Sequence, residues 1–177
     1  MRKPELLAPA GNREAFEAAL AAGADAIYLG AGSFNARRNA DNFDIDDLRA
    51  ACRDAHLRDA CVYLTANTLV FPGEMDDVLS MVTDAAEAGI DAAIVQDVGL
   101  MSVLRRELPE LELHASTQVS NRTPEGARFL GEAGFARVIL ERNLTLEEIR
   151  AICAATAAEV ECFVHGAVCV GYSGRCF

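Results

Sequence analysis

Aromatic residues are scarce in this chain of 177 residues: they make up 6% of the sequence, and tryptophan is absent. Long apolar runs are missing too. No stretch approaches the roughly 18 apolar residues of a membrane-spanning helix, and none follows the basic residues at the N-terminus. We therefore expect a cytoplasmic protein with no membrane partner.

Positive charge is also in short supply. The net charge is −11 and the sequence pI is near 4.7. Because such a surface repels phosphate backbones, this chain is not expected to be a general nucleic-acid binder. An RNA substrate would have to be held through regions outside it.

Familiar hydrolase motifs are absent as well. The sequence has no Gly-x-Ser-x-Gly, no zinc-protease helix motif and no evident Ser/His/Asp set, which argues weakly against hydrolysis by a standard nucleophile. Its six cysteines form no CxxC pair. In a reducing compartment, metal binding or burial is a better expectation for them than disulfides.

What the sequence does contain is a regular alternation of short β-rich runs and amphipathic helical runs. This alternation predicts parallel strands joined by helical crossovers. The predicted strands are Glu5–Ala10, Ala26–Gly30, Cys61–Asn67, Ala92–Asp97, Glu112–Thr117, Arg137–Glu141 and Val160–Gly166.

We interpret the fold class as α/β, a TIM-type (β/α) barrel that is incomplete. It has about seven parallel strands, where a closed barrel has eight and typically about 250 residues. Residues 1–177 would form a single truncated barrel domain that ends inside a cysteine-bearing loop. The alternative is a doubly wound open sheet.

An internal repeat supports the alternation. Ala22-Gly23-Ala24-Asp25 recurs as Ala88-Gly89-Ile90-Asp91 and Ala133-Gly134-Phe135-Ala136, each before a strand. Each glycine is predicted to end a helix in the left-handed conformation. Helix starts are predicted at Asn12, Asp44, Thr123 before Pro124, and the Thr145/Glu148 capping box.

Strand parity favours the barrel over the open sheet. One face of each of three strands carries polar residues, whereas a sheet covered by helices on both faces should be apolar on both. We expect these residues to face a barrel lumen, with Asn67 and Gln118 as candidate substrate-binding residues. The polar faces comprise Tyr63, Thr65 and Asn67; His114, Ser116 and Gln118; and Glu161, Phe163 and His165.

The densest chemistry lies at the end of the sequence. Cys169 and Cys176 are carried by a loop that contains Gly171 and Gly174 and follows the last predicted strand. Two thiols on such a loop suit a soft metal or a cluster, although free buried thiols are the alternative.

Three other residues are candidates for the same mouth of the barrel. Glu161 and His165 are candidate catalytic residues, as a general base or as partners of substrate, with a purely structural pairing as the alternative. Arg37, beside Arg38 in the loop after the second strand, is a candidate clamp for a carboxylate or phosphate, or else part of a solvated loop.

The terminal sequence Glu161-x-Phe163-x-x-Gly166-Ala167-Val168-Cys169, followed by Gly174-x-Cys176, resembles the diagnostic motif of the collagenase-like peptidases, peptidase family U32. The resemblance extends over essentially the whole chain, including Glu5-Leu6-Leu7-Ala8-Pro9-Ala10-Gly11-Asn12 and Ser116-Thr117-Gln118. It implies a barrel-like catalytic domain. Its RNA-modifying branch implies an oxygen-independent hydroxylase with a four-iron four-sulfur cluster and prephenate as hydroxyl donor.

On this resemblance Cys169 and Cys176 are two cluster ligands, and the remaining two would lie further along. The isolated chain is then expected to be cluster-free and inactive. The alternative is a peptidase in which His165, Cys169 and Cys176 hold zinc beside Glu161 as a base. A third reading is a truncated barrel that self-associates through its exposed strand edges.

Overall fold

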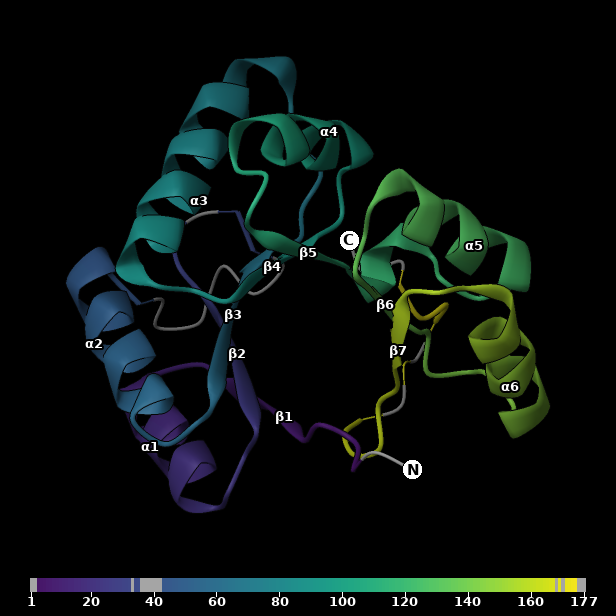
Figure 1. Cartoon of the computed structure of the whole chain (residues 1–177), viewed down its shortest axis with the longest axis horizontal. Coiled ribbons are helices and arrows are strands. Elements are labelled where there is room, and N and C mark those ends of the chain that lie inside the picture. Colours follow the sequence, from purple (N-terminus) through teal and green to yellow (C-terminus); the bar gives the residue numbers. More distant parts are fainter. Residues whose placement is uncertain (1–2, 33, 36–42, 168, 170, 175–177) are drawn as a thin grey trace. The chain divides into compact units, whose positions relative to one another are not determined.

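The computed structural model describes residues 3–32, 34–35, 43–167, 169 and 171–174, in which strands and helices alternate (Figure 1). The strands are β1 (Leu7–Ala10), β2 (Ala26–Gly30), β3 (Cys61–Ala66), β4 (Ala92–Val95), β5 (Glu112–Ala115), β6 (Arg137–Ile139) and β7 (Glu159–Glu161). The helices are α1 (Arg13–Ala21), α2 (Ile45–His56), α3 (Met75–Ala88), α4 (Val98–Glu107), α5 (Pro124–Ala133) and α6 (Leu146–Ala155), with short 3₁₀ helices η1 (Pro72–Glu74) and η2 (Thr117–Val119).

Strand order decides between the two predicted folds. Within the described residues the strands lie in the order β1 to β7. The registers of β1 with β2, β2 with β3, β5 with β6 and β6 with β7 are parallel. A doubly wound sheet reverses its strand order at a switch point, so that alternative is wrong. The predicted (β/α) barrel class is confirmed, with seven strands in the part of the chain that the structure describes.

The chain divides into two compact units. The first comprises Met1–Ala66 and Val70–Ala93, and the second comprises Asn67–Leu69 and Ile94–Phe177. In the first, α1 to α3 cover one face of β1 to β3; in the second, α5 and α6 cover one face of β6 and β7 (Figure 1). Side chains buried in the first unit include Phe16, Ile27, Leu29, Leu48 and Leu64, and those in the second include Leu100, Leu104, Leu113, Leu130 and Ile152.

The internal repeat has one structural role in all three copies. Gly23, Gly89 and Gly134 have φ values of +86°, +106° and +111°, as predicted. Two residues later the backbone N–H donates to a carbonyl oxygen at the start of the preceding strand. These bonds run from Asp25 to Leu6, from Asp91 to Val62 and from Ala136 to Leu113, each at 2.9 Å. The repeat therefore fixes where each strand begins to pair.

The aspartates of the first two copies add a second bond. The Asp25 carboxylate accepts from the Leu6 N–H at 2.8 Å, and the Asp91 carboxylate accepts from the Val62 N–H at 2.7 Å. Each aspartate thus makes a reciprocal pair with one residue of the preceding strand. In the third copy the carboxylate is absent, because Ala136 occupies that position.

The predicted helix starts are confirmed. The side chains of Asn12, Asp44, Thr123 and Thr145 each accept a hydrogen bond from the backbone N–H three residues later, which satisfies a donor that has no partner within the helix. Glu148 completes the capping box by accepting from the Thr145 N–H at 2.7 Å.

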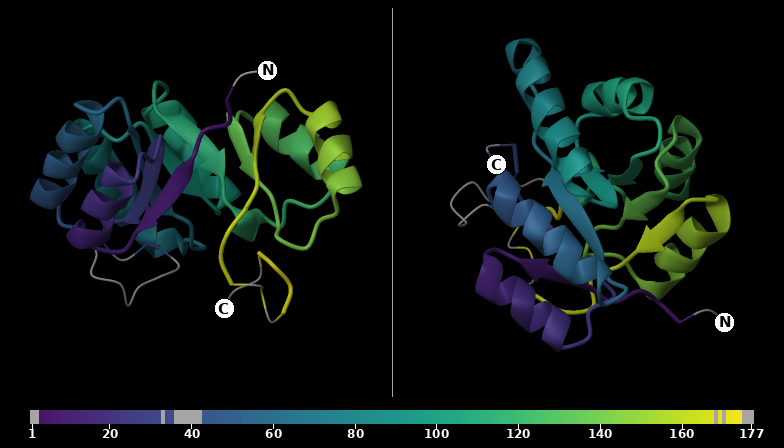
Figure 2. Two further views of the ribbon diagram at one scale, coloured as in Figure 1. Left: turned by 90° about the horizontal axis from the view of Figure 1, so that it is seen from below. Right: turned by 60° about the vertical axis from the view of Figure 1, so that its left-hand side comes forward.

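The last strand is shorter than predicted. It spans Glu159–Glu161 rather than Val160–Gly166, and the chain then continues as a loop (Figure 2). Val164, which lies in the predicted strand Val160–Gly166, is 89% exposed. No helix in the described part of the chain is long and apolar enough to cross a membrane.

The first prediction concerns Asp25. Hydrogen bonds from Lys3 and from the Leu6 N–H lower the pKa of Asp25. Because the pKa of Asp25 is lower in the folded state, the stabilisation that its carboxylate provides is present above the unfolded-state pKa, near 3.9. It is lost as the pH falls through the lower folded value. Asp25→Asn should therefore lower the melting temperature at pH 7 and flatten its dependence on pH below about 4.

Thermal unfolding followed by circular dichroism from pH 7 to pH 3 measures this effect. Glu110→Gln is the matched control, because Glu110 is exposed and its side chain makes no recorded hydrogen bond within the described residues. If the melting temperature depended equally on pH in wild type and in Asp25→Asn, the role assigned to Asp25 would be contradicted.

Candidate functional site at the ends of β5 and β6

Polar residues follow β5 and β6 directly, at the carboxyl edge of the sheet. Ser116 is buried, and its hydroxyl accepts from the Gln118 N–H at 3.3 Å and from the Asn67 side-chain amide at 3.4 Å. Two predicted substrate-binding residues, Asn67 and Gln118, are thus brought together at one hydroxyl. The carboxyl ends of strands are where (β/α) barrels carry their active sites.

Asn121 holds this edge together. Its side-chain amide donates to the carbonyl oxygens of Ala115, Ser116 and Ile139 at 3.3, 3.0 and 2.9 Å. Those three carbonyls lie at the ends of β5 and β6, where no further strand pairing is available to satisfy them. A buried carbonyl without a partner is costly, so Asn121 takes the place of the missing ladder.

A buried carboxylate lies beside Asn121. The Glu141 side chain is 1% exposed, and its Oε2 accepts from the Arg122 guanidinium through Nε at 3.0 Å and through Nη2. This hydrogen bond raises the pKa of Arg122. A carboxylate removed from water needs such a paired cation, because its isolated charge would cost several kcal/mol, on the order of the penalty for any buried ion.

The cysteine-bearing loop is anchored to this edge at two points. The Ser173 hydroxyl accepts from the Arg142 N–H at 3.1 Å, and the Arg142 guanidinium donates to the Ala167 carbonyl oxygen. Arg142 also covers the Phe163 ring, with its guanidinium carbon 4.1 Å from the ring centroid. Both anchors flank Cys169, which is half-buried.

Gly174, the residue after Ser173, packs closely against η2. Its φ is +79°, and a β-carbon at this position would lie well inside van der Waals contact of the Thr117 carbonyl oxygen in η2. Only glycine combines this backbone conformation with so close an approach. The loop therefore rests directly on the backbone that follows β5.

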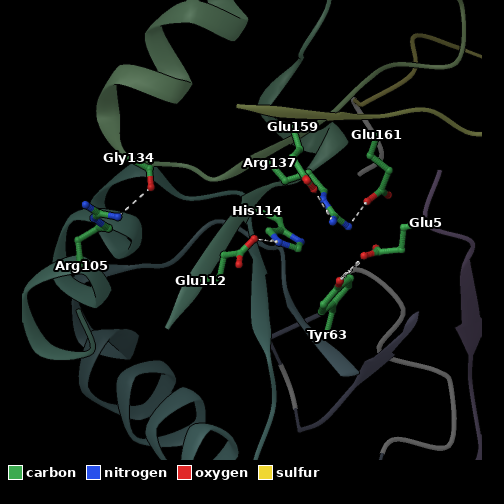
Figure 3. A network of polar contacts seen from close by, with 9 residues as sticks. All are labelled: Glu5, Tyr63, Arg105, Glu112, His114, Gly134, Arg137, Glu159 and Glu161. Atoms are coloured by element: carbon green, nitrogen blue, oxygen red, sulfur yellow. Dashed lines mark hydrogen bonds and ion pairs between the residues drawn. The ribbon is translucent and has the colours of Figure 1, made fainter. Parts of the chain in front are cut away.

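The candidate catalytic residue Glu161 lies in a different network (Figure 3). Arg137 pairs with Glu159 at 2.8 Å and with Glu161 at 3.5 Å. His114 pairs with Arg137 in the register of β5 and β6. It is buried, and its Nε2 lies 3.0 Å from the Glu112 carboxylate. The first residues of β5, β6 and β7 are Glu112, Arg137 and Glu159. In barrels, the amino ends of the strands contribute to stability. Glu161 therefore makes an ion pair with an arginine of the neighbouring strand.

The structure describes only some of the other predicted site residues. His165 is exposed in the loop after β7 rather than on a strand facing a lumen, because the strand ends four residues earlier. Arg37 and Cys176 lie outside the described residues. Among the residues that are described, no group of three His, Cys, Asp or Glu side chains could hold a metal ion.

Two other cysteines are poor candidates for ligands. Burial raises the pKa of the Cys52 thiol to about 12, and partial desolvation together with Cys153 raises the pKa of Cys162. A ligand or nucleophile must be the thiolate, which such environments disfavour.

Sequence reasoning missed the anchoring residues. Glu141 ends the predicted strand Arg137–Glu141, and Asn121 and Arg142 lie between predicted elements, where a single polar residue gives no sign of its contacts. Ser173 lies between Cys169 and Cys176, and no local pattern distinguishes its hydroxyl from that of any loop serine. Their importance comes from contacts between segments far apart in the sequence, for which no local signal exists.

Comparison with known proteins supports the family resemblance. The profile of peptidase family U32 matches residues 11–177. The chain belongs to peptidase family U32. It is 43% identical over 173 residues to the 23S rRNA 5-hydroxycytidine synthase of Escherichia coli, covering 98% of this chain and 26% of that protein. It is 40% identical to tRNA hydroxylation protein P1 of Bacillus subtilis, covering 99% of this chain and 42% of that protein.

A solved structure of a U32 peptidase has the same fold. It superposes with a TM-score of 0.73 at 17% identity, covering 90% of this chain and 68% of the other. The chain thus spans well under half the length of the curated U32 relatives named above.

The second prediction tests the loop anchor. Gly174→Ala should release the loop, because strain at positive φ costs about 1–3 kcal/mol and the β-carbon also clashes with η2. The rate of Cys169 alkylation in metal-free protein, followed by mass spectrometry, should rise several-fold. Gly171→Ala is the matched control, since a β-carbon there meets nothing within 4 Å. Equal rates in the two variants would show that the contact is dispensable.

The third prediction separates the readings of Glu161. If its role is structural, Glu161→Gln lowers the free energy of unfolding by about 1 kcal/mol, since Arg137 keeps Glu159. Arg137→Met should cost more, about 3 kcal/mol, because it leaves acidic groups without their cation. Urea denaturation measures both. A larger loss for Glu161→Gln than for Arg137→Met would contradict this ranking.

Proposed function

We propose that the intact protein is an iron–sulfur-dependent, oxygen-independent hydroxylase of RNA that works in the cytoplasm with prephenate as the hydroxyl donor. The observation that carries this proposal is the anchored loop. It fixes a half-buried cysteine at the carboxyl edge of β5 and β6, in a chain whose relatives include proteins named for rRNA and tRNA hydroxylation.

The residues present suit an iron–sulfur cluster. Cys169 would provide one thiolate ligand, and the Arg142 guanidinium holds the loop by donating to the Ala167 carbonyl oxygen, two residues before it. Cys176 is proposed as a second ligand. When bound, the cluster would supply the redox chemistry that no side chain can provide.

The chain's own residues would position the cysteine loop and orient the substrate. Ser173, Gly174 and Arg142 hold the cysteine loop in place, while Ser116 orders Asn67 and Gln118 at the same edge. Ser116 holds Asn67 by its side-chain amide and Gln118 by its backbone N–H, and a side-chain amide at this edge suits the recognition of polar groups on a substrate. For prephenate, an anion, Arg37 is proposed to contribute charge.

The fourth prediction tests the cluster. The intact protein, purified without oxygen, should contain about four irons and equivalent acid-labile sulfide per chain, as a cubane cluster requires. Cys169→Ala should lose both, together with the visible absorption band. Cys153→Ala is the matched control, since Cys153 is an exposed cysteine on α6. Hydroxylation would then be assayed as a mass increase of RNA incubated with prephenate.

The alternative is a peptidase, which the name of the family and of the solved relative support. In it, His165, Cys169 and Cys176 would bind zinc and Glu161 would act as the base. Stoichiometric zinc without iron would favour this alternative. Cleavage of gelatin that survives removal of contaminating proteases and disappears in Glu161→Gln would establish it.

A further inference from the structure

Two arginines meet two aromatic rings around the anchored loop. The guanidinium carbon of Arg122 lies 5.3 Å from the centroid of the Tyr172 ring, and that of Arg142 lies 4.1 Å from the centroid of the Phe163 ring. The rings are not buried: Tyr172 is 70% exposed and Phe163 is 38% exposed. We name these four residues the arginine–aromatic row.

The row is continuous through hydrogen bonds. Arg122 is held by Glu141, the residue before Arg142, and the Arg142 N–H donates to Ser173, the residue after Tyr172. The two stacked pairs therefore share one scaffold and flank Cys169. Such fixed guanidinium groups need little further ordering when they bind a ligand, which lowers the entropic cost of binding.

The charge of the row contrasts with the acidic chain. Glu141 is buried and balances Arg122. Arg142 contacts a carbonyl oxygen and a ring face, and within the described residues no carboxylate lies at ion-pair distance from it. In a protein of net charge −11, an uncompensated arginine beside exposed rings marks a local site for an anion that also carries an aromatic or apolar group.

An unpaired nucleotide has this chemistry. Its base stacks on aromatic rings and on guanidinium planes, and its phosphate pairs with arginine. We propose that the arginine–aromatic row binds an unpaired nucleotide of RNA, with the base on the open face of Tyr172 and the phosphate at Arg142. This inference rests on the proposed function, and it adds a contact within this chain to RNA contacts expected elsewhere.

A binding measurement on the intact protein tests the proposal. Fluorescence anisotropy of a labelled, unstructured single-stranded RNA gives the affinity. Tyr172→Ala should weaken binding about tenfold, within the range seen when a stacking aromatic is removed, whereas Tyr172→Phe keeps the ring and should bind like wild type. Phe129→Ala is the matched control, since Phe129 is 59% exposed on α5 and belongs to neither stacked pair.

Arg142 provides an independent readout. Arg142→Gln should reduce the slope of log affinity against log salt by about 0.7, the contribution of one phosphate contact on a single strand. Tyr172→Phe should leave that slope unchanged. A slope equal to that of wild type in Arg142→Gln would overturn the assignment of the phosphate.

The outcomes separate this inference from the proposed function. Wild-type protein that binds no RNA would overturn both. Wild-type binding that persists undiminished in Tyr172→Ala would overturn the row alone and leave the hydroxylase proposal standing. An equal loss in Tyr172→Ala and Phe129→Ala would also overturn it, as would equal binding of a fully paired duplex.

Discussion

Strand pairing in both units depends on one backbone position, two residues after each helix-ending glycine. The N–H there donates to the preceding strand, and in two copies its carbonyl accepts from the next: Cys61 donates to Asp25 at 3.0 Å, and Glu159 donates to Ala136 at 2.8 Å. One residue thus aligns three consecutive strands. Because side chains alternate in direction along a strand, an error of one residue here would turn the side chains of that strand to the opposite face of the sheet.

This alignment is what gives the site its position. Because Ala115 pairs with Val138, β5 and β6 end within one residue of each other, and the carbonyl oxygens of Ala115, Ser116 and Ile139 are close enough to accept from the Asn121 side-chain amide. Glu141, Arg142 and Ser116 follow at that edge and receive the cysteine loop. The polar residues at the carboxyl end therefore depend on strand pairing that is set at the amino end, where Arg137 also pairs with Glu159 and Glu161.

Local signals predicted much of the fold and less of the site. Left-handed glycines, helix caps and the start of Ala26–Gly30 are determined by a few neighbouring residues, so the sequence alone predicts them correctly. The last strand was overextended because Val160, Cys162 and Val164 alternate with polar residues as a strand would. That pattern takes no account of Arg142, which bonds the Ala167 carbonyl oxygen and stacks on Phe163 once the chain has folded back.

The loop anchor and the arginine–aromatic row use the same residues for different reasons. Burying Glu141 requires a cation, and satisfying it fixes Arg122 under the ring of Tyr172. Arg142 orders the loop through its backbone and through its guanidinium, and the second contact also holds Phe163. A substrate stacked on this row would therefore rest on the scaffold that positions Cys169, so that binding and chemistry share one rigid edge rather than two independently placed loops.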